Sequence, residues 1–175
     1  LADTAKQPKV GDPTLLETDV GPLIREGEVR RVDEWVREAV SGGAELLCGG
    51  EALSARCYAP TVLFDPPADS RVSTQEVFGP VVCVYPFDRI DRAIDLANAL
   101  PYAFQASVFS RDLDTALRAS RRLDASAVMI NDHTAFRVDW MPFAGLRESG
   151  LGIGGIPHTM KDMQIEKMTV IRSSE

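Results

Sequence analysis

The sequence predicts an α/β protein in which helices flank a parallel sheet. Residues 81–130 alternate short apolar runs with amphipathic stretches, and this strand–helix–strand–helix–strand order is typical of a parallel sheet. The links between these elements are short, which favours pairing between successive parallel strands. A chain of 175 residues with 45% hydrophobic and 26% charged residues is also large and apolar enough for one globular core.

The first third of the sequence is expected to contain a loop, a helix and a strand. Glycine and proline punctuate residues 11–22, which indicates the loop. Apolar residues recur at helical spacing over residues 23–41, and the pair Gly42-Gly43 ends this helix. Residues 58–64 read as a strand that stops at Asp65-Pro66-Pro67.

The middle of the sequence carries the alternating unit. Asp112 is expected to cap its second helix, because an aspartate oxygen accepts a hydrogen bond from a first-turn amide. Ligands collect at the carboxyl ends of the strands in such sheets, which points to the long polar and aromatic loop of residues 131–143. The predicted elements are strand 81–85, helix 89–98, strand 106–109, a helix after Asp112 that buries Leu113, Ala116 and Leu117, and strand 127–130.

The C-terminal part is expected to turn, form a short helix and end in a strand. Residues 145–155 are rich in glycine, and residues 158–163 follow as the helix. Residues 164–172 contain Met168-Thr169-Val170-Ile171 and read as the strand. This strand has no obvious partner in the preceding parallel unit, and an unpaired edge strand invites pairing with another copy of the chain.

Charge and cysteine content narrow the classes of partner. Lysine plus arginine number 19 and aspartate plus glutamate number 26, so the net charge is 19 − 26 = −7. An acidic surface of this kind argues against nucleic acid and anionic membranes as partners. No apolar run has the length of a membrane-spanning helix. The three cysteines form no C-x-x-C pair, which is simplest to reconcile with a reducing, cytoplasmic location.

The motif Glu76-Val77-Phe78-Gly79-Pro80 has two interpretations. In the structural one, Gly-Pro terminates a helix or turn and Phe78 lies in the core. In the functional one, the carboxylate of Glu76 accepts hydrogen bonds from the two neighbouring hydroxyls of a ribose. Phe78 would then lie against a planar ring such as nicotinamide.

Two further features occur in the C-terminal half. Gly150-Leu151-Gly152-Ile153-Gly154-Gly155 formally fits G-x-G-x-x-G, but a loop precedes it where a dinucleotide fingerprint needs a strand. We interpret it as backbone that turns tightly or approaches another chain closely. Arg137, in the loop of residues 131–143, either pairs with Asp132 or Asp139 or makes a bidentate contact with a carboxylate or phosphate of a substrate.

Together, six motifs in this order resemble the aldehyde dehydrogenase superfamily, over the chain from near Gly11 to its end. The segment from Ile130 to Pro142, which contains Arg137, is similar to a subgroup that acts on small polar or anionic aldehydes, such as lactaldehyde, phosphonoacetaldehyde and glyceraldehyde-3-phosphate. The six segments begin with Asp19-Val20-Gly21-Pro22-Leu23-Ile24, Glu45-Leu46-Leu47-Cys48-Gly49-Gly50 and Ala59-Pro60-Thr61-Val62, and continue with Glu76-Val77-Phe78-Gly79-Pro80-Val81, Met141-Pro142-Phe143-Ala144-Gly145 and Ser149-Gly150-Leu151-Gly152.

The resemblance implies a role for four residues and one cofactor. It implies that Glu76 binds the nicotinamide ribose of NAD or NADP and that Phe78 contacts the nicotinamide. It implies that Phe143 lines the aldehyde tunnel, and it raises the case for Arg137 as the group that recognises an anionic or hydroxylated aldehyde. A small-molecule aldehyde is thus the expected partner, in a homo-oligomer joined through the C-terminal strand.

The resemblance also implies what this chain does not supply. The family's nucleophilic cysteine, general-base glutamate and main cofactor domain lie N-terminal to the matched region, so we expect a C-terminal fragment with no dehydrogenase activity alone. Residues 1–155 would be a partial catalytic α/β domain, and residues 156–175 a helix and an oligomerisation strand. The alternative is a non-catalytic binding or assembly module that reuses the same fold.

Overall fold

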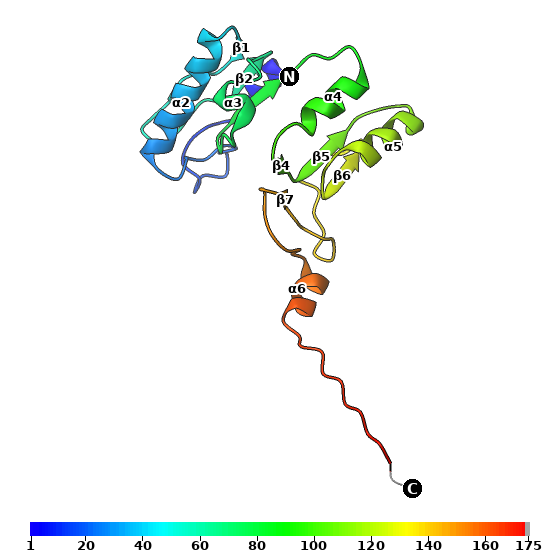
Figure 1. Cartoon of the computed structure of the whole chain (residues 1–175). Helices are drawn as coiled ribbons and strands as arrows, with labels where there is room; N and C mark the ends of the chain where they lie inside the picture. Colours follow the sequence, from blue (N-terminus) through cyan, green and yellow to red (C-terminus); the bar gives the residue numbers. More distant parts are fainter. Residues whose placement is uncertain (174–175) are drawn as a thin grey trace. The chain divides into compact units, whose positions relative to one another are not determined.

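The computed structural model describes residues 1–173 and combines helices with short strands (Figure 1), so the predicted α/β class is confirmed. The chain divides into two compact units, the first from Leu1 to Pro86 and the second from Phe87 onward. The division predicted after residue 155 stays a prediction. Within residues 1–173, no helix combines the length and the apolar composition needed to cross a membrane.

The first unit places one long helix against a three-stranded mixed sheet. The strand order is β1–β2–β3, in which β1 and β2 are antiparallel while β2 and β3 are parallel. Its elements are α1 (Ala2–Ala5), α2 (Glu26–Ser41), β1 (Glu45–Cys48), β2 (Thr61–Phe64), α3 (Arg71–Thr74) and β3 (Val81–Val84).

Helix α2 confirms the predicted helix, with its start at Glu26 instead of residue 23. Two acidic residues, Glu26 and Glu28, lie in the first turn, where they favour the positive end of the helix dipole. Its buried stripe has helical spacing and is at most 4% exposed; it consists of Val29, Val32, Val36 and Ala39.

The core of the first unit forms where α2 meets β2. Leu63 is completely buried and Tyr58, just before β2, is 1% exposed. The Tyr58 hydroxyl donates to Asp33 Oδ1 on α2 at 3.4 Å, and burial raises the pKa of this phenol well above its ordinary value. Strand β2 lies between β1 and β3, and three of its four residues are buried, which agrees with its nearly continuous apolar sequence.

The second unit is built from two small strand pairs and three helices. Strands β5 and β6 are parallel, as expected for successive strands joined by a helix, and β4 and β7 are antiparallel. Its elements are α4 (Ile90–Ala97), β4 (Tyr102–Ala103), β5 (Gln105–Val108), α5 (Leu113–Arg122), β6 (Ala127–Ile130), β7 (Leu146–Arg147) and α6 (Ile156–Asp162).

Parallel strand pairs are confirmed, within small sheets that hold two or three strands each. Strand β3 pairs with β2, which precedes it in the sequence, while β5 pairs with β6. The described strands therefore form small mixed sheets. Strand–helix–strand order predicts the direction of the strands, but it does not by itself identify which strand is the neighbour.

Helix α5 begins as predicted, because the amide of Thr115 donates to the Asp112 carboxylate at 2.7 Å. Its buried face is narrower than predicted. Ala116 is 1% exposed, but Leu113 is 66% and Leu117 38% exposed, so the prediction that these leucines are buried is wrong. The small side chain of Ala116 lets the helix approach β5 and β6 closely, and the leucines lie beside that contact line.

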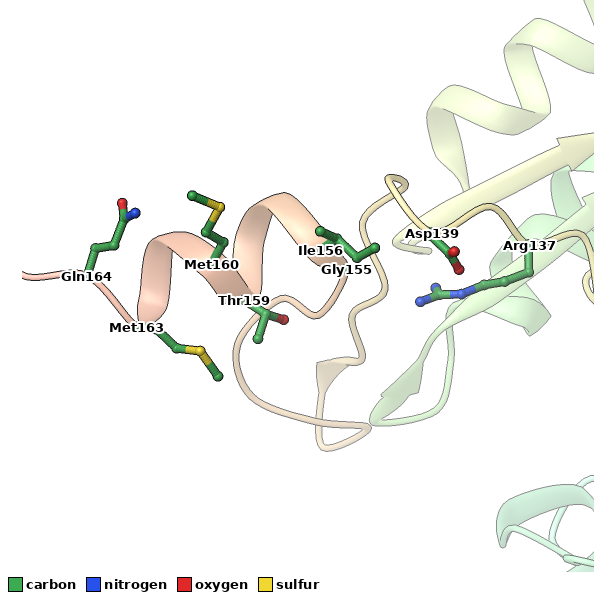
Figure 2. A pocket seen from close by; sticks show the side chains of 8 residues that line it. All are labelled: Arg137, Asp139, Gly155, Ile156, Thr159, Met160, Met163 and Gln164. Carbon is green, nitrogen blue, oxygen red and sulfur yellow. The ribbon is translucent and has the colours of Figure 1, made fainter.

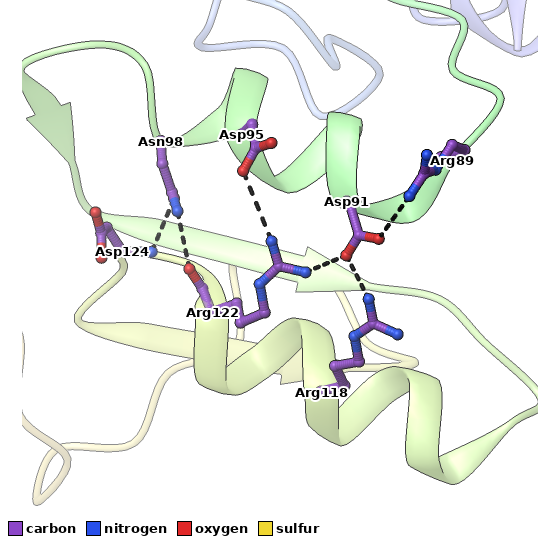
Figure 3. A network of polar contacts seen from close by, with 7 residues as sticks. All are labelled: Arg89, Asp91, Asp95, Asn98, Arg118, Arg122 and Asp124. Atoms are coloured by element: carbon purple, nitrogen blue, oxygen red, sulfur yellow. Dashed lines mark hydrogen bonds and ion pairs between the residues drawn. The ribbon is translucent and has the colours of Figure 1, made fainter.

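An ion-pair network joins α4 to α5 (Figure 3). Asp91 on α4 accepts hydrogen bonds from Arg122 and Arg118 on α5, and these hold the pKa of its carboxyl below the usual value. The amide of Asn98 donates to the carbonyl of Arg122 at 2.8 Å and accepts from the amide of Asp124 at 2.9 Å. These polar contacts hold α4 and α5 together on the exposed side of the helix pair.

Within residues 1–173, the predicted C-terminal strand has no partner to pair with, and its role in assembly stays a prediction. After α6, which covers most of the predicted helix, residues 164–173 run out as an extended stretch without a hydrogen-bonded ladder (Figure 1). Its apolar side chains face solvent, with Ile165 95%, Met168 87% and Ile171 87% exposed. A strand requires a partner, and among residues 1–173 none lies beside this segment.

Candidate functional site

The motif of residues 76–80 lies on the surface of the first unit, between α3 and β3. Glu76 is exposed and Phe78 is 76% exposed, while Val77 between them turns inward against the core. The interpretation that placed Phe78 in the core is therefore wrong. Phe78 has a backbone φ of +50°, a left-handed conformation that costs a non-glycine residue about 1 kcal/mol or more.

Glu76 and Phe78 present a carboxylate and an aromatic ring to solvent, two residues apart. Among residues 1–173, the Glu76 carboxylate forms no ion pair, so both of its oxygens remain available for a vicinal diol. Phe78, two residues away, presents an apolar ring to solvent. Strained backbone with an exposed aromatic is uncommon in a purely structural turn and more frequent at ligand-binding positions.

In the second unit, Arg137 and Phe143 come together. The guanidinium carbon of Arg137 lies 4.4 Å from the centroid of the Phe143 ring, within the range of a cation–π contact. Phe104 supports the other side of this ring edge-on, with centroids 4.9 Å apart and an interplanar angle of 86°. The backbone of Phe143 is fixed in turn by two hydrogen bonds with Gly154, of 3.0 and 2.8 Å.

Neither predicted partner neutralises Arg137. Within the part of the chain that the structure describes, no carboxylate lies within 4.0 Å of its guanidinium. Asp132 instead accepts from the amide of His133 at 2.8 Å, and the backbone carbonyl of Asp139 accepts from the amide of Ile156 at 3.1 Å. The guanidinium is thus held by an aromatic ring and keeps its donors free for an anion.

Arg137 and Asp139 border an open groove of about 590 Å³ (Figure 2). The loop of residues 131–143 forms one side and α6 forms the other. Apolar groups dominate the α6 side, so the groove combines one cation, one carboxylate and an apolar wall. From α6 and its two ends come Gly155, Ile156, Thr159, Met160, Met163 and Gln164.

The glycine-rich stretch turns the backbone and is not a dinucleotide fingerprint. The strand before it, β7, is a two-residue antiparallel partner of β4, and α6 has only seven residues. Gly155 has a φ of +110°, and a Cβ there would lie 2.5 Å from the Met141 carbonyl oxygen. The interpretation of this stretch as backbone that turns tightly is confirmed.

The structure thus brings the four predicted residues together as two pairs, each within its own unit. Sequence reasoning missed the residues that support them. Asn131, at a φ of +58°, exchanges two hydrogen bonds with the backbone of Ser110, at 2.9 and 3.0 Å, and so fixes the start of the loop that carries Arg137. An asparagine directly after a buried strand was the available signal for it, because asparagine tolerates left-handed backbone.

Comparison with known proteins gives a consistent result. The model described as "Aldehyde dehydrogenase family" matches residues 1–169. The chain is 39% identical to the 3-sulfolactaldehyde dehydrogenase of Priestia aryabhattai, over 98% of this chain and 36% of that protein. It is 41% identical to aspartate-semialdehyde dehydrogenase 1 of Pseudomonas canavaninivorans, over 93% of this chain and 34% of that protein. The chain spans about a third of the length of the curated relatives it matches.

Solved structures agree with the sequence matches. Aldehyde dehydrogenase 21 from Physcomitrella patens, in complex with the reaction product succinate, superposes with a TM-score of 0.88 at 34% identity, over 93% of this chain and 34% of that chain. GapN from Methanocaldococcus jannaschii, a glyceraldehyde-3-phosphate dehydrogenase complexed with NADP, superposes with a TM-score of 0.87 at 34% identity, over 93% of this chain and 35% of that chain.

Proposed function

Because the chain belongs to the aldehyde dehydrogenase family, we propose that it forms part of an NAD(P)-dependent enzyme that oxidises a small polar or anionic aldehyde to the carboxylic acid. The observation that carries this proposal is the free guanidinium of Arg137, held against the ring of Phe143. The apolar ring suits a short carbon chain, and the cation suits an anionic group at the far end of it.

Several relatives support an anionic substrate, while others are by name dehydrogenases of lactaldehyde, which is polar and uncharged. The names of the former include 3-sulfolactaldehyde, sulfoacetaldehyde and aspartate semialdehyde, and one structure holds the dicarboxylate succinate as its reaction product. Each of these molecules carries a charged group a few atoms from the aldehyde or from the acid it becomes. We assign the recognition of this group to Arg137 and the wall of the aldehyde site to Phe143.

The cofactor end of the proposed reaction belongs to Glu76 and Phe78. Relatives of known structure hold NADP or NAD+, and when bound the nicotinamide supplies a hydride acceptor. Glu76 would accept hydrogen bonds from the two ribose hydroxyls, and Phe78 would lie against the nicotinamide. Both residues orient the cofactor and neither takes part in bond making.

Two of the three cysteines of this chain, Cys48 and Cys83, suit structural roles and not that of the nucleophile. Cys48 is buried, and burial raises the pKa of the Cys83 thiol, which opposes formation of the reactive thiolate. We therefore expect that the purified chain, given NAD or NADP and a panel of small aldehydes, forms no reduced cofactor above background. Sustained aldehyde-dependent NADH or NADPH absorbance would contradict this expectation.

The free cysteines agree with a cytoplasmic location. Assembly is a separate point: the solvent-facing apolar side chains of residues 164–173 support pairing with a second copy through this segment. Light scattering of the complete enzyme and of a variant ending at residue 163 would check the proposed assembly. An unchanged mass after removal of the segment would count against it.

Replacing Glu76 with glutamine tests the cofactor assignment. In the enzyme that contains this chain, Glu76→Gln is expected to weaken NAD(P)H binding about tenfold, because it removes a charge-assisted hydrogen bond worth about 1.5 kcal/mol. Fluorescence titration of NAD(P)H measures the dissociation constant. Glu17→Gln, at an exposed position in the same unit, is the matched control. Equal dissociation constants for both variants would refute the assignment.

A further inference from the structure

A side chain of α2 reaches across to the backbone of the motif that carries Glu76 and Phe78. Nη2 of Arg31 donates to the carbonyl oxygen of Val77 at 2.6 Å, although the two residues are 46 positions apart. Nε of the same guanidinium donates to Glu28 at 2.7 Å, one turn earlier on α2. The side chains of Arg31 and Glu28 are only 27% and 19% exposed, so water competes weakly for these bonds.

The guanidinium of Arg31 also lies over the ring of Trp35, one turn later on α2. Its carbon lies 4.4 Å from the centroid of the Trp35 ring. A second guanidinium, that of Arg71, lies 5.6 Å from the same centroid and is bound by Glu34 and Glu38 on α2. The Arg31 guanidinium therefore contacts a carboxylate, an aromatic ring and the carbonyl of Val77. Three such contacts fix its position, unlike that of an arginine exposed on the surface.

The motif that Arg31 holds requires support. Phe78 is in the left-handed conformation, which a free turn would leave. The turn also passes very close to α2, since a Cβ on Gly79 would lie 3.0 Å from Val32 Cγ2. With Val77 turned inward, the residues on either side of it, Glu76 and Phe78, project outward together.

We infer that Arg31 is a positioning residue for the cofactor: through the Val77 carbonyl it holds the turn in the conformation in which Glu76 meets the ribose and Phe78 meets the nicotinamide. This inference rests on the proposed function of Glu76 and Phe78. Arg31 itself need not touch the cofactor. A structural ion pair alone would stabilise α2 without affecting how the nucleotide binds.

The test replaces Arg31 in the enzyme that contains this chain. Arg31→Met keeps an unbranched apolar stem but removes the guanidinium, and with it both hydrogen bonds and the cation–π contact with Trp35. It is expected to raise the dissociation constant of NAD(P)H about tenfold. The KM of the aldehyde should stay within about twofold, since only the cofactor end loses its support. Arg31→Lys retains a donor and should recover part of the loss.

Arg37→Met is the matched control. Arg37 lies on the same helix and is ion-paired with Asp33 at 2.8 Å, but its side chain is 74% exposed and its ion pair stays within α2. The inference expects wild-type cofactor binding from this variant. Equal losses from Arg31→Met and Arg37→Met, or equal increases in the KM of cofactor and aldehyde, would reduce Arg31 to a structural role and overturn the inference.

Two measurements separate positioning from direct contact. Amide hydrogen exchange at Phe78 and Gly79, measured by NMR without cofactor, should speed up in Arg31→Met and not in Arg37→Met. The double variant Arg31→Met/Glu76→Gln should lose less NAD(P)H affinity than the product of the two single losses, because Arg31 acts in part through the placement of Glu76. Unchanged exchange or fully multiplicative losses would overturn the inference.

The same experiments distinguish the failure of this inference from that of the proposed function. If Glu76→Gln binds NAD(P)H like the wild type, the cofactor assignment fails and the inference falls with it. If Glu76→Gln weakens binding while Arg31→Met does not, the cofactor assignment stands and only the role of Arg31 is refuted.

Discussion

Arg137→Ala is expected to lower kcat/KM for an anionic aldehyde about a hundredfold, while kcat/KM for a neutral aldehyde of similar length stays within about twofold. The guanidinium rests on Phe143 and has no carboxylate partner within residues 1–173, so its donors are free for the substrate. Loss of a charge-assisted, two-pronged contact of this kind costs about 2.7 kcal/mol. Steady-state kinetics with 3-carbon aldehydes that do and do not carry a sulfonate or carboxylate would measure it.

Two further variants make the Arg137 result specific. Arg137→Lys keeps the charge but loses the planar fork, so we expect an intermediate loss confined to the anionic aldehyde. Arg92→Ala removes an exposed arginine of α4 in the same unit and should leave both substrates unaffected. A loss of equal size for anionic and neutral aldehydes would mean that Arg137 supports the loop and does not recognise charge.

Gly49→Ala is expected to destabilise the first unit by about 3 kcal/mol or more. Gly49 has a φ of +72°, and a Cβ there would lie 2.3 Å from the Pro60 carbonyl oxygen and 2.5 Å from Thr61 Oγ1. Thr61 is 1% exposed and its hydroxyl accepts from the amide of Gly50 at 2.8 Å, so it cannot move aside without breaking that bond. Backbone strain and overpacking of this kind each cost about 1–3 kcal/mol.

Gly43 provides the control for the glycine prediction. It also has a positive φ, of +113°, but a Cβ there meets nothing within 4 Å. Gly43→Ala should therefore show the cost of the left-handed backbone alone, about 1 kcal/mol. Urea unfolding of both variants, followed through the fluorescence of Trp35 in the first unit, separates steric clash from conformational strain. Similar free energies of unfolding for the two variants would contradict the proposed crowding around Thr61.

Local elements of this fold are predictable where the physical signal is local. The apolar stripe of α2 and the Asp112 cap of α5 depend on residues within four positions of one another, and both are confirmed. Strand pairing depends on distant partners, so the sequence predicts parallel strands but does not identify β2 as the neighbour of β3. The segment of residues 164–173 shows the same limit, since apolar residues favour a strand but only a partner can complete one.

In the candidate site, too, the sequence predicts some features and not others. The chemistry of Glu76 and Arg137 follows from their residue types and their motifs, but what surrounds them does not. No sequence spacing indicates that Arg31 reaches the carbonyl of Val77 or that Phe104 meets the ring of Phe143. These contacts join residues dozens of positions apart, and a single sequence contains no record of such proximity.

The stacking of Arg137 on Phe143 has a thermodynamic consequence for selectivity. A free arginine side chain loses about 2 kcal/mol of rotamer entropy when a ligand immobilises it, whereas one already held over an aromatic ring has much less entropy to lose. Ordering of the Arg137 side chain then costs little of the binding free energy. The charge of the substrate and the distance between its charged group and its aldehyde make the larger contributions. We therefore expect the enzyme to discriminate among aldehydes with sulfonate, carboxylate or phosphate groups mainly by the length of the carbon chain, and less by the shape of the charged group.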